Sequence, residues 1–258
     1  MPSIRGSSRG WSDGRGVNRI LLEPAEIHGD VATFGGDRAG HVLKILHGEV
    51  GQTLKTGEIG GLVGTSEIVA VGADGSVTVR VTHEVQPLPS WVDIVLAPPR
   101  PRALKRLLPQ LATMGVGTVT LVGAKKVEKD FWGATLLQEE NYRPLLVDGL
   151  MQGGVATELP RIELRRNFRK FVNDELDAAY PTARRLVAHP DGSRGGSAAA
   201  VPVPPGRLLL AIGPEGGWTD EEISLLESHG FARYSLGRRI LRTDTATVAL
   251  LARLETLQ

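Results

Sequence analysis

Residues 208–222 read LLLAIGPEGGWTDEE, and this stretch decides how the second half of the chain is expected to fold. Its first five residues are apolar, which is typical of a short strand that is buried on both faces of a sheet. The turn GPEGG follows, and Thr219 and Glu222 then stand three positions apart, as in the capping box that begins many helices. The stretch therefore predicts a buried strand, a tight turn and a capped helix.

A second stretch, SLGRRILRTDTA at residues 235–246, repeats this order. A short strand over 233–236 gives way to a glycine, a basic loop and a helix expected over 245–257, for which Thr243 or Asp244 is a suitable N-cap. Taken alone, each turn is most simply a tight connection. The arginines of the second stretch, Arg238, Arg239 and Arg242, are then most simply surface charges. Ligands of open α/β sheets bind beyond the carboxyl ends of strands, so two such loops together favour a ligand site.

The chain from residue 90 onwards alternates short apolar runs with segments of helical spacing. Such alternation predicts a parallel sheet with helices on both faces. The expected strands are 92–97, 118–122, 186–188, 207–212 and 233–236, and the expected helices are 104–114, 135–151 with an interruption at Pro144, 171–179, 219–229 and 245–257.

The chain before residue 86 has a different texture, with short apolar runs that glycines separate. The turn signal Ala73-Asp74-Gly75-Ser76 lies between two β-like runs and predicts a hairpin. We therefore expect a small β-barrel or sandwich. Two prolines within Gln86–Ser90 mark a domain boundary. Residues 1–16 are rich in Gly, Ser and Arg, and we interpret them as a flexible arm.

Composition excludes several kinds of chemistry. The chain has no Cys, so disulfides, Cys-ligated zinc and a Cys nucleophile are excluded. Its six His residues show no metal-ligand spacing, and no metal is expected. The charge is uneven: residues 1–95 carry 8 Lys+Arg against 11 Asp+Glu, and residues 96–258 carry 22 against 18. Basic clusters at 100–106 and 161–170 can hold phosphates, but on charge alone a solvated surface is the simpler interpretation.

The two motifs, IGPEGGWTDEE and SLGRRILRTDTA, resemble the paired signature of the RsmE family. Members of that family are SPOUT-class methyltransferases that act on N3 of a uridine in 16S ribosomal RNA. Weaker similarity covers most of the chain, in NRILLEP at residues 18–24, HVLKILHGEVGQTL at 41–54 and LKRLLPQLATMGV at 104–116.

The resemblance implies a fold and partners that the hydrophobic pattern of the sequence cannot predict. It implies a PUA-like β-barrel RNA-binding domain over residues 17–86. It also implies a SPOUT α/β domain over residues 90–258, in which a trefoil knot holds S-adenosyl-L-methionine (SAM). A homodimer is implied as well, with the active site near the subunit interface. The expected substrate is 16S rRNA of the small ribosomal subunit, and the expected location is the cytoplasm, with no membrane association.

The resemblance also assigns site residues. Methylation at uridine N3 requires loss of a proton, and the site should stabilise negative charge that develops on the pyrimidine. Arg242 suits that role because a guanidinium stays charged and binds planar anions in bidentate fashion, while Glu215 or Asp244 is expected to accept the proton. The expected RNA contacts are Arg19, His41 and Lys44. The expected SAM contacts are Ile212, Gly213, Pro214, Glu215, Gly217, Leu236, Gly237, Ile240, Leu241, Thr245 and Ala246.

Three positions depart from the family pattern and leave alternatives open. The segment 151–160 lacks the usual Arg, 113–116 lacks the usual Glu, and Asp244 stands where the family has Glu. One alternative is another SPOUT methyltransferase, acting on tRNA or on a ribose 2′-hydroxyl. The other is a non-catalytic RNA-binding protein of ribosome assembly.

Overall fold

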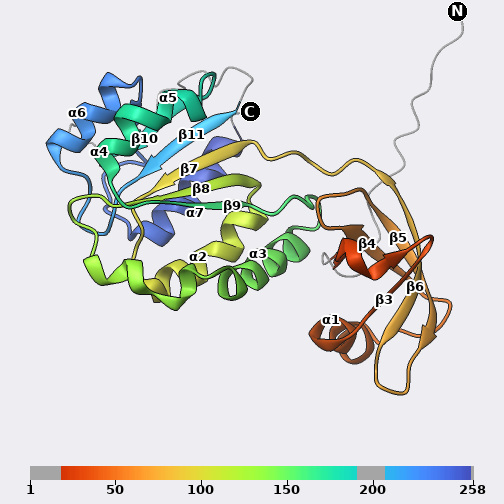
Figure 1. Ribbon diagram of the computed structural model, residues 1–258. Helices are drawn as coiled ribbons and strands as arrows, with labels where there is room; N and C mark the ends of the chain where they lie inside the picture. Colours follow the sequence, from red (N-terminus) through yellow and green to blue (C-terminus); the bar gives the residue numbers. More distant parts are fainter. Residues whose placement is uncertain (1–18, 191–206, 257–258) are drawn as a thin grey trace, which may run out of the picture.

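The computed structural model describes residues 19–190 and 207–256, and these residues form two sheets joined by an extended segment (Figure 1). The arm predicted over residues 1–16 lies outside the described residues. We call the first sheet, β1–β6, the N-terminal sheet and the second, β7–β12, the C-terminal sheet. Strand β6 (Val77–Val85) ends shortly before β7 (Val92–Leu96), so the proline-containing segment lies between the sheets.

The N-terminal sheet is curled and open, with the strand order β1-β4-β5-β6-β3-β2. The predicted small barrel takes the form of a curled half-barrel, in which β1 and β2 are the two edges. The predicted hairpin is confirmed, since β5 and β6 pair antiparallel around a turn in which the Gly72 amide donates to the Ser76 carbonyl at 2.8 Å. The remaining elements are β1 (Ile20–Leu22), β2 (Ile27–His28), β3 (Val31–Phe34), α1 (Gly36–Gly40), a π turn (His41–Ile45), β4 (Thr53–Glu58) and β5 (Val63–Val71).

The C-terminal sheet is entirely parallel, with the order β12-β10-β11-β7-β8-β9, as the strand–helix alternation predicts. Strand β11 (Leu208–Ile212), the predicted apolar strand, lies near the middle and is buried at every position. The other strands are β8 (Val116–Val122), β9 (Arg161–Arg165), β10 (Arg184–Ala188), β11 (Leu208–Ile212) and β12 (Ala232–Tyr234).

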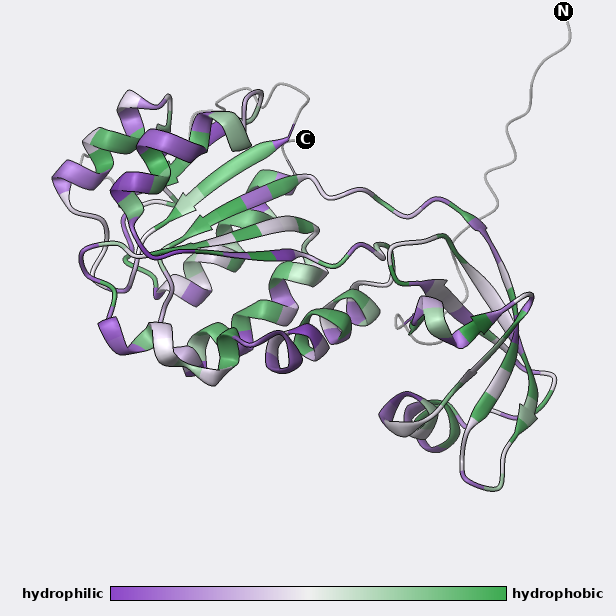
Figure 2. Cartoon of the chain, viewed as in Figure 1, coloured by the Kyte–Doolittle hydropathy of each residue, from purple (hydrophilic) through white to green (hydrophobic). Residues whose placement is uncertain are grey.

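Helices cover both faces of this sheet and bury a separate apolar core on each (Figures 1 and 2). Helices α2 (Pro101–Thr113), α3 (Glu139–Gly153) and α7 (Thr243–Glu255) cover one face. The run α4 (Phe168–Lys170), a π turn (Phe171–Glu175) and α5 (Leu176–Ala179) covers the other face together with α6 (Asp220–Ser228). Strand residues alternate between the two cores, because successive side chains of a strand point to opposite faces.

Two expectations about these elements are corrected. Helix α3 runs through Pro144 without interruption, and Leu146 and Leu150 beyond the proline are buried in the core. Proline removes one helical hydrogen bond, and the burial of these leucines offsets that loss. Helix α7 begins two residues earlier than expected, with Arg242 as its N-cap and no side-chain cap. At α6 the predicted capping box between Thr219 and Glu222 is confirmed.

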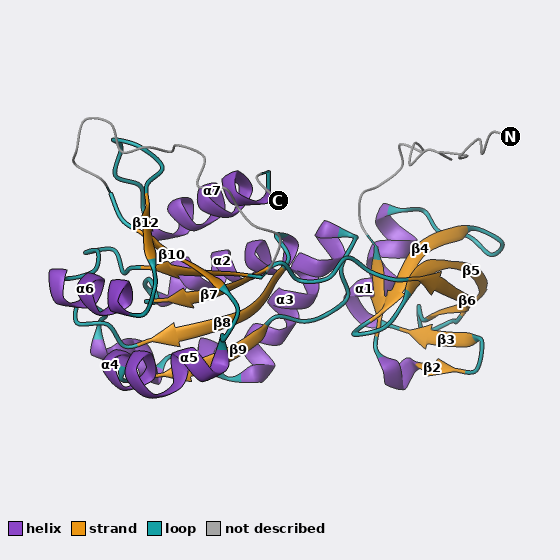
Figure 3. Cartoon of the chain, turned by 90° about the horizontal axis from the view of Figure 1, so that it is seen from above, coloured by secondary structure: helices purple, strands orange, loops and turns teal. Residues whose placement is uncertain are grey.

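The N-terminal sheet docks on the end of α3 and on the segment that leads from it into β9 (Figure 3). The Arg19 amide donates to the Met151 carbonyl at 3.0 Å, and the Gly60 amide donates to the Thr157 carbonyl at 2.9 Å. Arg143 of α3 adds a bidentate ion pair with Glu23, with both distances 2.8 Å. Since this segment enters β9, the N-terminal sheet lies at the amino edge of the parallel sheet.

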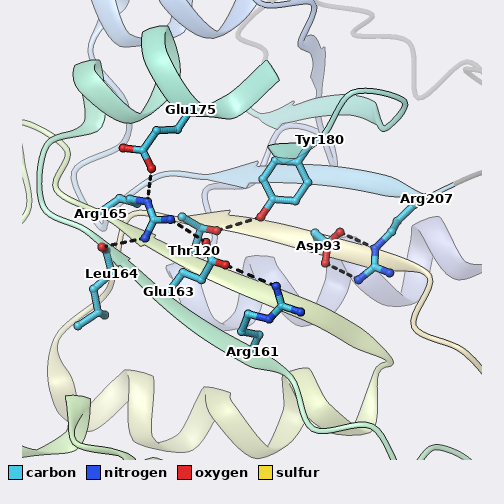
Figure 4. Close-up of polar contacts among 9 residues, drawn as sticks. All are labelled: Asp93, Thr120, Arg161, Glu163, Leu164, Arg165, Glu175, Tyr180 and Arg207. Atoms are coloured by element: carbon cyan, nitrogen blue, oxygen red, sulfur yellow. Dashed lines mark hydrogen bonds and ion pairs between the residues drawn. The ribbon is translucent and has the colours of Figure 1, made fainter. Parts of the chain in front are cut away.

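A polar cluster lies on the face of the C-terminal sheet that the α4–α5 run covers (Figure 4). Asp93 on β7 is 2% exposed, and Arg207 holds it through two contacts of 2.5 and 2.8 Å. Nearby, the hydroxyls of Thr120 and Tyr180 lie 3.0 Å apart. Burial, which is the largest influence, raises the pKa of Tyr180, so this phenol stays neutral at physiological pH. The cluster is satisfied internally.

Candidate active site

A pocket of about 360 Å³ opens at the carboxyl ends of β10, β11 and β12. These strands are neighbours in the sheet, so the loops that follow them meet at one edge. Parallel sheets bind ligands at this edge, and the pocket volume falls within the usual range for small-molecule sites. The lining residues are Ala188, His189, Pro190, Ile212, Gly213, Pro214, Glu215, Gly216, Gly217, Trp218, Tyr234, Ser235, Leu236, Gly237, Arg239, Ile240, Leu241, Thr243, Ala246 and Leu250.

The loop after β11 forms one wall, and two of its glycines are required by geometry. Gly217 has a φ of +69°, a conformation that other residues adopt only with strain. Gly213 packs against Trp218 so closely that a Cβ there would lie 3.1 Å from the indole. The Trp218 Nε1 is buried and has no hydrogen-bond acceptor among the described residues. A polar ligand atom at this wall would satisfy that donor.

The loop after β12 forms the opposite wall and presents apolar side chains. Gly237 turns the chain with a φ of +114°. Ile240 is 86% exposed, and Leu236 and Leu241 are each 38% exposed. Exposed large apolar side chains beside a pocket mark a surface that another molecule covers. The Thr243 hydroxyl donates to the Gly213 carbonyl at 3.4 Å, which connects the two loops directly.

The structure brings the predicted SAM contacts together. Ten of the eleven line this pocket, and the exception is Thr245, which is exposed in the first turn of α7. Two motifs that are separate in the sequence thus line one cavity, as expected from strand ends at a common edge.

Of the predicted catalytic residues, one lines the pocket, and Arg242 stands in the chain between the lining residues Leu241 and Thr243. Arg242 is exposed at the N-cap of α7. Glu215 lines the pocket, and its carboxylate lies 3.9 Å from the guanidinium of Arg100. Asp244 is held by Arg106 of α2 at 3.1 Å. Partial burial acts to raise the pKa of Asp244, but hydrogen bonds from the Thr245 amide and Arg106 outweigh it, so the net pKa is lowered.

The predicted RNA contacts are not gathered on one surface. Arg19 is 5% exposed, and its guanidinium donates to the carbonyls of Gly154, Thr56 and Gly64 at 2.8, 2.6 and 2.9 Å. Those bonds fix it at the junction between the sheets, so its placement does not support the expected RNA contact. Lys44 is exposed on the π turn, whereas the Nε2 of His41 is buried without a partner among the described residues.

Sequence reasoning missed part of the lining. His189 and Pro190 follow β10, and the His189 amide donates to the Tyr234 carbonyl at 3.1 Å. Their position directly after a predicted strand could have indicated that they line the site, but neither residue belongs to a recognisable motif. Trp218, Thr243 and Arg239 stand inside the two motifs and were not assigned. Within the described residues, no cluster of His, Cys, Asp and Glu could hold a metal ion, and no helix has the length and apolarity to cross a membrane.

Comparison with known proteins shows the family to which the chain is similar. An RNA methyltransferase domain family matches residues 86–255, which include the whole C-terminal sheet and its pocket. Ribosomal RNA small subunit methyltransferase E of Treponema pallidum is 31% identical and covers 92% of this chain and 90% of its own. A Legionella pneumophila protein whose structure contains the bound cofactor SAM has a TM-score of 0.73 and 26% identity, covering 94% of this chain and 98% of that one.

A Neisseria gonorrhoeae ribosomal RNA small subunit methyltransferase E, solved with SAM, has a TM-score of 0.71 at 19% identity, covering 93% of this chain and 97% of that one, and supports the fold. The parallel sheet, its strand-end pocket and the matched domain together define an RNA methyltransferase domain. The chain belongs to the ribosomal RNA small subunit methyltransferase E family.

Proposed function

We propose that this protein transfers a methyl group from SAM to N3 of a uridine in 16S rRNA of the small ribosomal subunit. The observation that carries the proposal is the single pocket that the loops 213–219 and 235–242 build at adjacent strand ends. Family membership supplies the substrate class, and the SAM-containing relatives supply the methyl donor.

The pocket residues fit SAM. Glycine-rich backbone at Gly213 and Gly217 allows close approach of a ligand, and the buried indole N–H of Trp218 offers a donor that no described residue satisfies. Leu236, Ile240 and Leu241 present apolar surface for the adenine. We propose that these residues, with Ile212, Pro214, Glu215, Gly237, Thr245 and Ala246, hold the cofactor.

The chemistry divides between alignment and charge. When bound, SAM supplies a methyl group on a positively charged sulfur. The protein has to align the acceptor with it and stabilise the uridine as N3 loses its proton. Arg242, which is exposed and stands between the lining residues Leu241 and Thr243, is proposed to bind the anionic pyrimidine edge.

Of the two carboxylates considered as proton acceptor, Glu215 is favoured. A base of lowered pKa accepts a proton poorly, and the pKa of Asp244 is lowered by its hydrogen bonds to the Thr245 amide and Arg106 against the opposing effect of burial. The carboxylate of Asp244 also forms an ion pair with the guanidinium of Arg106 at 3.1 Å. Glu215 lines the pocket and has only a 3.9 Å ion pair with Arg100.

We further propose the finer architecture that the family resemblance implies. Residues 17–86 form a PUA-like RNA-binding domain that contacts RNA through His41 and Lys44. Residues 90–258 form a SPOUT domain with a trefoil knot around the cofactor loops. The protein works as a homodimer in the cytoplasm. The exposed Leu236, Ile240 and Leu241 beside the pocket support a partner subunit near the active site.

Calorimetric titration with SAM and with S-adenosylhomocysteine tests the cofactor part of the proposal. Saturable binding of both is expected, and binding of neither by folded protein with RNA present would favour the non-catalytic alternative. Transfer of labelled methyl from SAM to 16S rRNA, compared with transfer to bulk tRNA, tests the substrate. Preferential labelling of tRNA would favour the other SPOUT activity.

A further inference from the structure

Basic side chains gather at the carboxyl edge of the C-terminal sheet, next to the pocket but outside it. The segments that follow β7, β8 and β9 are 97–106, 123–130 and 166–170. Together they carry ten Lys or Arg and two Asp or Glu. We call them the basic loops.

The opposite edge of the same three strands shows that this charge is not a general property of the surface. The segments that lead into β7, β8 and β9 are 86–91, 114–115 and 154–160, and they contain a single charged residue, Glu158. At these three strands, the edge that faces the N-terminal sheet therefore carries one charged residue, whereas the opposite edge is strongly basic.

The basic loops are fixed to one another. The Gly123 amide donates to the Arg165 carbonyl at 3.0 Å, and Gly123 packs so closely on Arg166 that a Cβ would lie 2.0 Å from the Arg166 carbonyl oxygen. The guanidinium of Arg166 lies 5.9 Å from the ring centre of Trp132, which belongs to the segment after β8. The charges are thus presented on a preformed surface.

The basic loops also adjoin the pocket wall. The Lys126 ammonium donates to the Gly216 carbonyl at 2.8 Å, and Arg100 reaches the pocket carboxylate of Glu215 at 3.9 Å. A hollow of about 40 Å³ lies between the loops after β7 and β8 and shares Pro214 and Glu215 with the cofactor pocket. A polymer leaving the pocket would pass over these loops.

At least half of the ten cations are available to a partner. Within the described residues Arg100 pairs with Glu128 at 3.2 Å, and Arg106 pairs with Asp244. The side chains of Arg102, Lys105, Lys129, Arg169 and Lys170 are exposed and form no ion pair at contact distance in the part of the chain that the structure describes. By contrast, Arg161 and Arg165 of β9 pair with Glu163 on the sheet face.

We propose that the basic loops form a phosphate-binding track, which holds the RNA backbone on either side of the nucleotide that enters the pocket. The proposal deepens the proposed function and rests on it for the identity of the RNA. Exposed cations on segments that are fixed to one another suit a polyanion, because phosphate contacts position a nucleic acid without reading its sequence.

The test compares two double variants of the full chain. K129Q/R169Q removes one charge from each of two basic loops. The matched control R161Q/R253Q removes two exposed charges, one from the face of β9 and one from the last turn of α7. The probe is transcribed 16S rRNA, titrated at several salt concentrations, with SAM affinity and thermal unfolding measured on every variant as a folding control.

Each lost phosphate contact should reduce the slope of log Kd against log salt by about 0.7 to 0.9. The K129Q/R169Q variant should therefore bind RNA about 30-fold more weakly near 0.1 M salt, with its slope reduced by roughly 1.5. SAM affinity and the unfolding midpoint should stay unchanged, and the control should bind RNA like the wild type.

Equal RNA binding by K129Q/R169Q and wild type would overturn the track, as would an equal loss in the control. Methyl transfer by the wild type is scored separately. If it transfers methyl to 16S rRNA while K129Q/R169Q binds RNA normally, the track fails and the proposed function stands. If it methylates no RNA but binds RNA through the basic loops, the proposed function fails and the track stands.

Discussion

The substitution Arg19→Met separates two roles for a residue that the sequence suggested as an RNA contact. In the structure its guanidinium donates three hydrogen bonds of 2.6 to 2.9 Å to the carbonyls of Thr56, Gly64 and Gly154. The last of these carbonyls belongs to the segment on which the N-terminal sheet docks. Methionine keeps the apolar stem and the Arg19 main-chain bond to Met151 while removing the donors.

The expected loss follows from those contacts. Hydrogen bonds from a charged donor contribute about 1.5 to 3 kcal/mol each, so three would sum to several kcal/mol. Burial of the guanidinium opposes this, and it also lowers the pKa of Arg19. We expect a net decrease in the free energy of unfolding of about 3 to 5 kcal/mol, as when one partner of a buried charged interaction is removed.

Urea denaturation followed by circular dichroism measures this change, with Arg80→Met as the control in the same sheet. Arg80 is about half exposed and forms only long ion pairs of 3.4 and 3.8 Å. Its replacement by Met should therefore lower the free energy of unfolding by less than about 1 kcal/mol. SAM affinity of folded Arg19→Met should equal that of wild type, because the pocket lies at the far edge. Unchanged stability with weakened RNA binding would refute the structural role and return Arg19 to an RNA surface.

Three further predictions follow from named contacts. Arg242→Ala should lower turnover by about 10²- to 10³-fold while changing the Kd of SAM little; calorimetry with steady-state rates checks this, and equal losses in both would reject its role. Gly217→Ala strains a residue with φ of +69° by about 1 to 2 kcal/mol. It should weaken SAM binding about 5- to 30-fold, whereas wild-type affinity would mean that the loop does not contact the cofactor. Arg143 holds the pKa of Glu23 below 4.5, chiefly through a hydrogen bond. A carboxyl with a depressed folded pKa stabilises above its unfolded pKa and loses that contribution as pH falls. Stability should therefore drop as pH decreases below 4.5, and Glu23→Gln should show a smaller drop in the same titration.

Much of the C-terminal sheet could be predicted because its strands carry their own signals. The run from Leu208 to Ile212 is apolar throughout, and the Thr219 and Glu222 pair marks a helix start whatever surrounds it. Strand β9 was missed: Arg161–Arg165 alternates charged and apolar residues as a strand does, but its arginines were interpreted as part of a basic cluster. That strand is stabilised by its pairing with β8 and by ion pairs on the sheet face, which are contacts that a local pattern does not contain.

The site was predicted where a motif lay at a strand end and missed where it did not. Gly213 and Gly237 each follow a predicted strand and indicated the turns that line the pocket. His189 belongs to no motif, and it reaches the pocket only because β10 lies between β11 and β12. The burial of Arg19 could not be predicted from the sequence either. Its partners are 37 to 135 positions away in the chain, so nothing local distinguishes a buried arginine from a surface one.

The most direct test of the central claim is nucleoside mass spectrometry of 16S rRNA after incubation with SAM and the purified protein. The RNA should come from cells that lack the activity, and it should be offered both free and within small subunits. We predict one N3-methyluridine, absent when Arg242→Ala replaces the wild type. A 2′-O-methylated nucleoside, or no new methyl group with either substrate despite saturating SAM, would contradict the account.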